Sequence, residues 1–139
     1  MFPKFLSVAA IAGTLLIGAM PAGAATTSKT AILKHQTGPL AGSMAGQAKL
    51  SYGRSKGWFG GAKVLKHQLA EGKYNYVVSF TMQDGTTWTS NVCTLHVGKK
   101  LAQASCHGTA NMLPGDWGVT NTASIVPVAG GAPKMVGSF

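Results

Sequence analysis

The sequence is poor in acidic residues. Glu71, Asp84 and Asp116 are its only carboxylate side chains, against twelve lysines and arginines, so the formal net charge is +9. Catalysis by carboxylates needs two acids held close together, and a Ser-His-Asp site needs one acid to orient its histidine. Each of the three acids stands beside a glycine, as turn residues do. This scarcity of general acids and bases predicts that the protein is not an enzyme.

Cysteine is also scarce, with Cys93 and Cys106 alone. A metal centre needs a cluster of three or four ligands, and the four histidines do not supply one at a recognisable spacing. We therefore expect neither a metal nor another cofactor. In an oxidising compartment an isolated cysteine pair is typical of a structural disulfide, so the sequence predicts a bridge between Cys93 and Cys106.

Beyond the N-terminus the sequence lacks any apolar run long enough to cross a membrane. At the N-terminus, Lys4 precedes a mostly apolar stretch over residues 5–20, followed by Pro21 and small residues at 22–24. This order is typical of a secretory signal peptide cleaved after Ala24. The stretch, of about 16 residues, is shorter than the roughly 20 that a retained membrane anchor needs. The sequence thus predicts an exported protein, periplasmic or secreted, with no transmembrane segment after cleavage.

The positive charge points to acidic partners. Cleavage would remove Lys4 and leave eleven cations and three acids, a net charge of +8. A field of this sign attracts polyanions, which for an exported protein are anionic glycans or lipid headgroups; we do not expect nucleic acid as a partner. Charge that only keeps the protein soluble is the alternative explanation.

Alternating residue patterns predict β-structure. In residues 74–82 large apolar side chains occupy every second position, the period of a half-buried strand. Asp84-Gly85 then predicts a two-residue hairpin turn, which places Met82 opposite Thr87 and Tyr76 opposite Cys93. Pairing Cys93 with Cys106 predicts a third strand beside the second, with Lys99-Lys100 at the turn. A disulfide that bridges two sheets is the alternative.

About six to eight short strands, with turn signals every 8–12 residues, predict an all-β fold, a small antiparallel β-sandwich or jelly-roll-like domain. The expected segments are a signal peptide (1–24), a flexible N-terminal lead-in that supplies at most an edge strand (25–46), a single β domain (47–128) and a Gly/Pro-containing C-terminal tail (129–139). The tetrapeptide Leu-Lys-His-Gln occurs at 33–36 and again at 65–68, as the trace of a duplicated strand or by coincidence.

The densest group of cations lies in residues 49–73, which hold six of the eleven. Within it, residues 57–61 set a tryptophan and a phenylalanine between glycines. Such rings can stack on a sugar or dip into a membrane surface while the cations hold phosphates or carboxylates. Alternatively, Trp58 or Phe59 fills one end of the core and the lysines form a solvated rim. The candidate polyanion-binding residues are Arg54, Lys56, Trp58, Phe59, Lys63 and Lys66.

Two functions are compatible with these features. The first is a non-enzymatic module that binds an anionic envelope or extracellular component, a glycan or a lipid headgroup, through this basic aromatic loop. The second is a structural or assembly protein of the cell envelope or surface that associates through β-edges. Salt separates them, because a polyanion binder loses affinity steeply as ionic strength rises and edge-strand assembly does not.

Overall fold

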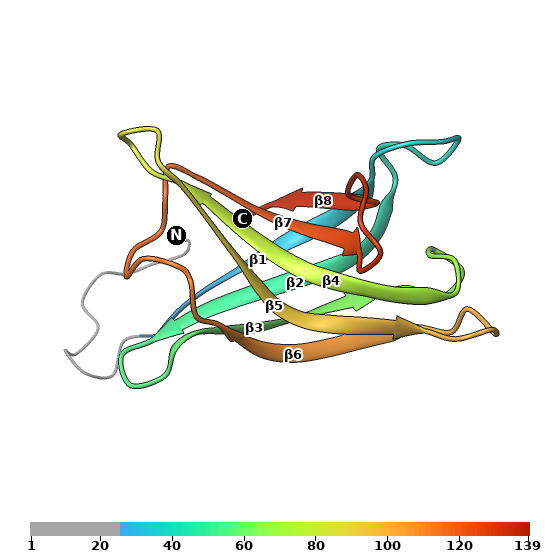
Figure 1. Cartoon of the computed structure of the whole chain (residues 1–139), viewed down its shortest axis with the longest axis horizontal. Helices are drawn as coiled ribbons and strands as arrows, with labels where there is room; N and C mark the ends of the chain where they lie inside the picture. The colour runs from blue at the N-terminus through green and yellow to red at the C-terminus, as the bar shows by residue number, and fades with distance from the viewer. Residues whose placement is uncertain (1–25) are drawn as a thin grey trace, which may run out of the picture.

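The computed structural model describes residues 26–139, and within them the chain forms strands and loops but no helix (Figure 1). The all-β prediction is confirmed. The predicted signal peptide, residues 1–24, lies outside the described residues. None of the described segments is a helix with the length and apolarity needed to span a membrane. The strands are β1 (Thr26–His35), β2 (Met44–Gly53), β3 (Gly57–Val64), β4 (Gly72–Thr81), β5 (Thr87–Val97), β6 (Ala104–Ala110), β7 (Thr120–Pro127) and β8 (Met135–Ser138).

All eight strands belong to one antiparallel sheet, in the order β5-β4-β7-β8-β1-β2-β3-β6. The sheet curls until its two end strands, β5 and β6, lie beside each other (Figure 1). The predicted disulfide is confirmed there, with the Cα atoms of Cys93 and Cys106 5.8 Å apart. The expected sandwich-like or jelly-roll-like domain therefore takes the form of a single, nearly closed barrel.

The register of the β4–β5 hairpin follows the prediction along half of its length. Tyr76 pairs with Cys93, as expected. A β-bulge then shifts the register by one residue, so that Thr81 rather than Met82 pairs with Thr87. Bulges add local twist to a strand pair, and the alternation of apolar residues in β4 carries no sign of an extra residue in β5.

The turn of this hairpin is longer than predicted. A two-residue turn of the expected type needs positive φ at both central residues, and here only Gly85 has it, with φ of 88°. The Asp84 carboxylate instead accepts a hydrogen bond of 2.9 Å from the Thr86 backbone N–H. A backbone bond from Met82 N–H to the Thr86 carbonyl closes the loop. The prediction of a two-residue turn is therefore wrong.

The predicted third strand, β6, lies beside β5 but does not pair with it. β6 pairs with β3 along its whole length, from Trp58 opposite Ala110 to Val64 opposite Ala104, and no ladder joins it to β5 within residues 26–139. Lys99 and Lys100 are the central residues of a turn, as predicted, closed by a hydrogen bond of 3.0 Å from Leu101 N–H to the Gly98 carbonyl, and this turn belongs to a longer loop over residues 98–103. The Leu101 carbonyl in this loop accepts a hydrogen bond from His67 N–H, which fastens the loop beside the end of β3.

Both terminal segments contribute strands. β1 lies between β8 and β2 rather than at an edge, and β8 lies between β7 and β1. The inward side chains of Ala31, Leu33 and Met135 are fully buried. The domain therefore includes much of the expected lead-in and tail, and the expected boundaries at 47 and 128 are too narrow. Small inward residues such as Ala31 hide this strand from an analysis of composition.

Inward side chains fill the barrel. One end is closed by a cluster of aromatic rings whose neighbouring centroids are 4.7 to 5.8 Å apart. Trp117, from the loop between β6 and β7, joins this cluster and donates a hydrogen bond to Thr27. Small barrels are normally filled in this way. The cluster consists of Tyr52, Trp58, Phe80, Trp117 and Phe139.

Candidate functional site

Four neighbouring strands, β1, β2, β3 and β6, share an outer surface that we call the cationic face, and it carries the candidate residues Phe59 and Lys63. Alternate residues of a strand point to opposite sides of the sheet, and the register aligns the outward ones in rows across these strands. The rows are Ser51–Phe59–Thr109, Thr30–Lys49–Gly61–His107 and Gln47–Lys63–Ser105.

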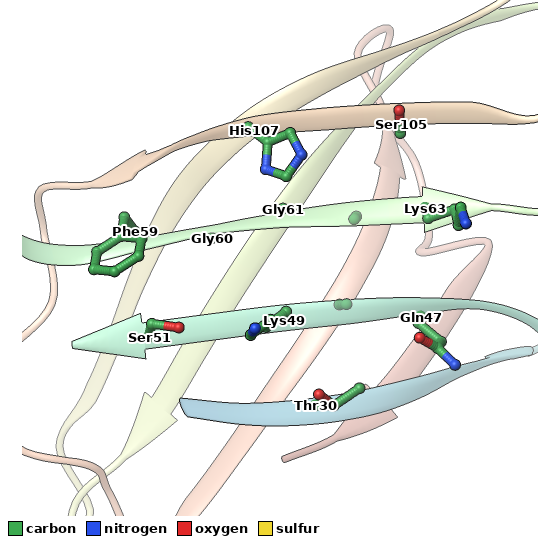
Figure 2. Close-up of a pocket in the computed structure, with 12 residues that line it drawn as sticks. Thr30, Gln47, Lys49, Ser51, Phe59, Gly60, Gly61, Lys63, Ser105 and His107 are labelled. Atoms are coloured by element: carbon green, nitrogen blue, oxygen red, sulfur yellow. The ribbon is translucent and has the colours of Figure 1, made fainter. Parts of the chain in front are cut away.

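A groove of about 440 Å³ crosses the cationic face (Figure 2). Its floor is the backbone of β3 at Gly60 and Gly61, between the side chains of Lys49 and His107. A Cβ at Gly61 would lie 2.7 Å from the His107 ring nitrogen Nδ1 and would also press on the Cys106 carbonyl oxygen. The groove therefore exists because β3 carries glycine where a side chain would fill it.

The floor is supported from inside the barrel by Tyr76. Its hydroxyl donates a hydrogen bond of 3.0 Å to the Lys49 carbonyl oxygen, and a Cβ at Gly60 would collide with the same oxygen. Burial raises the pKa of Tyr76 far above its usual range, because the interior disfavours a charged phenolate. The hydroxyl thus keeps its proton and holds the backbone from which the Lys49 side chain projects.

The charge in the groove is of one sign. Exposed Lys49 and Lys63 stand with exposed His107 around it, and no carboxylate lines it. Within residues 26–139 the side-chain nitrogens of these three make no hydrogen bond to another protein group. At the end marked by Phe59, the Lys56 ammonium lies 5.6 Å from the ring centroid. The arrangement suits an anion joined to a group that packs on an aromatic ring.

The sequence candidates divide into three groups. Phe59 and Lys63 line the groove, and Lys56 contacts Phe59. Arg54 is exposed in the turn between β2 and β3, next to this end of the groove in sequence. Lys66 lies beyond the end of β3, in the loop that leads to β4, and does not line the groove.

Trp58 forms the third group, because it belongs to the core. Its side chain is only 4% exposed and packs against Phe80 and Trp117, with ring centroids 5.0 and 4.8 Å away. The indole N–H donates a hydrogen bond to the Pro114 carbonyl. Trp58 and Phe59 are consecutive in a strand and so point to opposite sides. Trp58 therefore fills one end of the core, which is the second of the two alternatives, and it is not part of the candidate site.

Lys49 and His107 are groove residues that the sequence candidates did not include. Lys49 belongs to the basic segment, and its alternation with the inward Ala48 and Leu50 marks it as outward. His107 reaches the groove only because β6 pairs with β3, which places it opposite Gly61. That pairing joins distant parts of the chain, and no local sequence pattern predicts it.

The other histidines form no comparable site. His35 Nε2 lies 2.7 Å from Gln68 Oε1, a hydrogen bond that joins the two Leu-Lys-His-Gln segments. The first copy is in and just after β1, and the second lies in a loop where His67 has a φ of 65°. The two copies therefore differ in conformation. In the part of the chain that the structure describes, no three His, Cys, Asp or Glu side chains gather as a metal ion would require.

Comparison with known proteins adds no relative: neither a protein-family model, nor a curated protein, nor a solved structure matches the chain.

Proposed function

We propose that this protein is a non-enzymatic module that binds an anionic component of the cell envelope or extracellular space, a glycan or a lipid headgroup, in the groove of the cationic face. One observation carries the proposal. Lys49, Lys63 and His107 surround a glycine floor, without a carboxylate beside them and without bonds from their side chains to the rest of the described protein.

The geometry suits a phosphate, sulfate or carboxylate above Gly61. Lys49 and His107 lie on either side of Gly61, one strand away in each direction, so their backbones are about 10 Å apart. Both side chains can approach a single anion from opposite directions. Hydrogen bonds to a charged group are stronger than neutral ones, but the groove is open to water, so salt should weaken binding. Phe59 offers an apolar surface for the rest of the ligand.

The proposal includes export from the cytoplasm. The signal-peptide pattern in residues 1–24 and the disulfide between Cys93 and Cys106 are both typical of exported proteins. An exported module of this charge meets the acidic polymers and lipids of the envelope before it meets nucleic acid.

The test compares two double variants with the same change in charge. Lys49→Gln/Lys63→Gln removes the groove lysines, and Lys73→Gln/Lys134→Gln removes two exposed lysines outside the groove. Heparin and vesicles rich in anionic lipid serve as probes, each titrated at several salt concentrations. We expect the groove variant to lose most of its affinity and to lower the slope of log affinity against log salt by roughly two, one for each cation.

Folding should be unaffected in both variants, because exposed charges contribute little to stability. Equal losses in the two variants would show that binding follows net charge and not the groove, and would overturn the proposed site. Failure of the unmodified protein to bind either probe at low salt would overturn the proposed function.

Association through a β-edge is the second candidate, and one feature of β1 favours it. β8 pairs with β1 only at Lys34 and His35. On that side, residues 26–30 have no ladder partner within the described chain, whereas Ala31 and Ile32 lie against Gly137 of β8. An edge without a partner can accept another strand. Sedimentation at rising protein concentration tests this function. An oligomer that persists in high salt supports it, and a monomer at every concentration contradicts self-association through this edge.

A further inference from the structure

A second recess, of about 350 Å³, lies at the end of the barrel nearest Phe59. The loop after β6 forms one side of it, with Asn111 and Leu113 among its residues, and the turn between β2 and β3 forms the other. The recess is lined by the amide of Asn111, the phenol of Tyr52 and apolar groups. Sugar rings, which have apolar faces and hydroxyl edges, fit such a mixture.

The recess and the groove are neighbours along the same strands. Ser51 and Phe59 line the groove, and the residues adjacent to them in sequence, Tyr52 and Trp58, line the recess. Lys56 connects the two, because it lines the recess while its ammonium lies 5.6 Å from the centroid of the Phe59 ring. The end of the β2–β3 hairpin, with Phe59 on its outer side and Lys56 in its turn, therefore forms the ridge between the two hollows.

We infer that the groove and the recess are consecutive subsites for one linear anionic polysaccharide. The chain lies along the cationic face, passes over the ridge of Phe59 and Lys56 and ends in the recess. This inference rests on the proposed function and narrows its ligand to a glycan.

The dimensions and the shape favour a polymer over a headgroup. From Lys63 to Phe59 the groove follows four residues of strand, about 13 Å, and the recess extends the path further. Cations stand along this path at Lys63, Lys49 and Lys56, as the spaced charges of an acidic polysaccharide require. A flat membrane surface cannot follow the path from the side of the barrel to its end, whereas a flexible chain can.

The length of the ligand provides the test. Heparin-derived oligosaccharides, from the disaccharide to the octasaccharide, are titrated into the unmodified protein by calorimetry at one low salt concentration. We expect the affinity, corrected for the number of binding registers, to rise by about tenfold as the oligosaccharide becomes longer, which is equivalent to 1.4 kcal/mol. The affinity should then level off once the oligosaccharide is long enough to fill both subsites. Equal affinity at all lengths would overturn the inference.

A variant of the recess identifies the second subsite. Asn111 is exposed, so Asn111→Ala should fold normally. It should abolish most of the gain for long oligosaccharides and leave the disaccharide affinity unchanged. Lys56→Gln should act in the same direction and also reduce the salt dependence for long probes. A length gain that survives both variants would show that the extra units bind elsewhere, and would overturn the assignment.

The outcomes also separate this inference from the proposed function. Salt-sensitive disaccharide binding without any length gain removes the second subsite but keeps the groove. Vesicles of anionic lipid that bind more tightly than the octasaccharide, with no effect of Asn111→Ala, favour a headgroup and overturn the glycan. No binding by any probe removes both.

Discussion

The two halves of the sheet differ outside the barrel far more than inside it. We call the outer surface of β5, β4, β7 and β8 the neutral face, because Lys73 in β4 is the only lysine, arginine or acidic residue in these four strands. Its side chains bond to one another, since Ser79 and Thr89 hydroxyls are 3.1 Å apart and the Thr94 hydroxyl donates to Asn75 at 2.9 Å. On the cationic face the groove lysines have no such partners, and glycines occupy central positions. The outward residues of the neutral face include Asn75, Val77, Ser79, Thr89, Asn91, Thr94, Thr122, Ser124 and Val126.

The difference separates the requirements of the fold from those of the site. Both halves supply inward apolar residues, such as Leu50 in β2 and Val78 in β4, each fully buried. A strand of a barrel needs this alternation, but it can carry almost any polar residue outside. The neutral face shows how the outside is filled when side chains satisfy each other. The unpaired charges and missing side chains of the cationic face are not needed for folding and are open to a ligand.

The largest expected effect distinguishes the two sides of β3. Trp58→Ala should lower the free energy of unfolding by about 3–5 kcal/mol, because it deletes a buried aromatic ring. Phe59→Ala should change it by less than about 1 kcal/mol, as for an outward residue, and should weaken heparin binding. Denaturant titration and heparin binding measure the two quantities. Equal destabilisation by the two variants would place Phe59 in the core and remove it from the site.

The disulfide joins the last strand of each face and has the next largest expected effect. Replacing Cys93 and Cys106 by alanine should lower the free energy of unfolding by about 3 kcal/mol in the chain-entropy model. Heparin binding below the melting temperature should persist, because β6 stays paired with β3. Thermal melting and binding of the double variant check this. Free thiols in the unreduced, denatured parent protein would contradict the bridge itself.

An added methyl group should distinguish the cationic face from the neutral one. Gly61→Ala should lower the free energy of unfolding by about 1–3 kcal/mol through overpacking and abolish binding, since its Cβ presses on His107 and Cys106. Ser124→Ala is the control on the neutral face and should change stability by less than about 0.5 kcal/mol. If Gly61→Ala binds heparin normally, the floor of the groove is not the site.

The smallest expected effect concerns Tyr76, which reaches from β4 of the neutral half to the backbone of β2 in the cationic half. Burial raises its pKa in the folded state, while the unfolded value is about 10. Below pH 10 both states keep the proton, and above it the unfolded state alone loses it. The free energy of unfolding should therefore fall by about 1.4 kcal/mol per pH unit from this residue.

Denaturant titrations between pH 9 and pH 11.5 measure this slope. Tyr76→Phe should reduce the slope by one proton and lower stability at neutral pH by about 1 kcal/mol, because the Lys49 carbonyl loses its donor. An unchanged slope in the variant would mean that Tyr76 is not the group that resists ionisation.

Local patterns predicted the centre of the fold. The alternation in residues 74–82 identified Tyr74, Tyr76, Val78 and Phe80 as inward, and all four are buried. What the sequence could not predict is non-local. The pairing of β6 with β3 and of β7 with β4 joins segments far apart in the chain, and each depends on the whole barrel closing. The same limit applies to the two Leu-Lys-His-Gln segments. Their residues are identical, but their conformations differ because their surroundings in the fold differ.

The candidate site was predicted only in part, because some of its residues meet through the same non-local strand pairings. Cation density and the aromatic pair pointed to Phe59 and Lys63, which do line the groove. Trp58 was included because glycines on both sides suggested a loop, whereas residues 57–64 form a strand that sends alternate side chains in opposite directions. Lys49 and His107 meet across Gly61 through the registers of β2 and β6 with β3, which no spacing in the sequence reveals.

The position of β1 between β2 and β8 has a consequence for how the protein is made. The β4–β5 hairpin and the cysteine pair, separated by 13 positions, join near neighbours in the chain, whereas β1 must wait for β8, which is synthesised last among the described strands. Pairings between such distant segments form slowly. Thiol and amide pulse-labelling during refolding should show the cysteines protected before the amides at the β1–β8 junction. Until then the strands form two separate parts, β5-β4-β7-β8 and β1-β2-β3-β6, and the facing sides of β8 and β1 are exposed edges that favour aggregation.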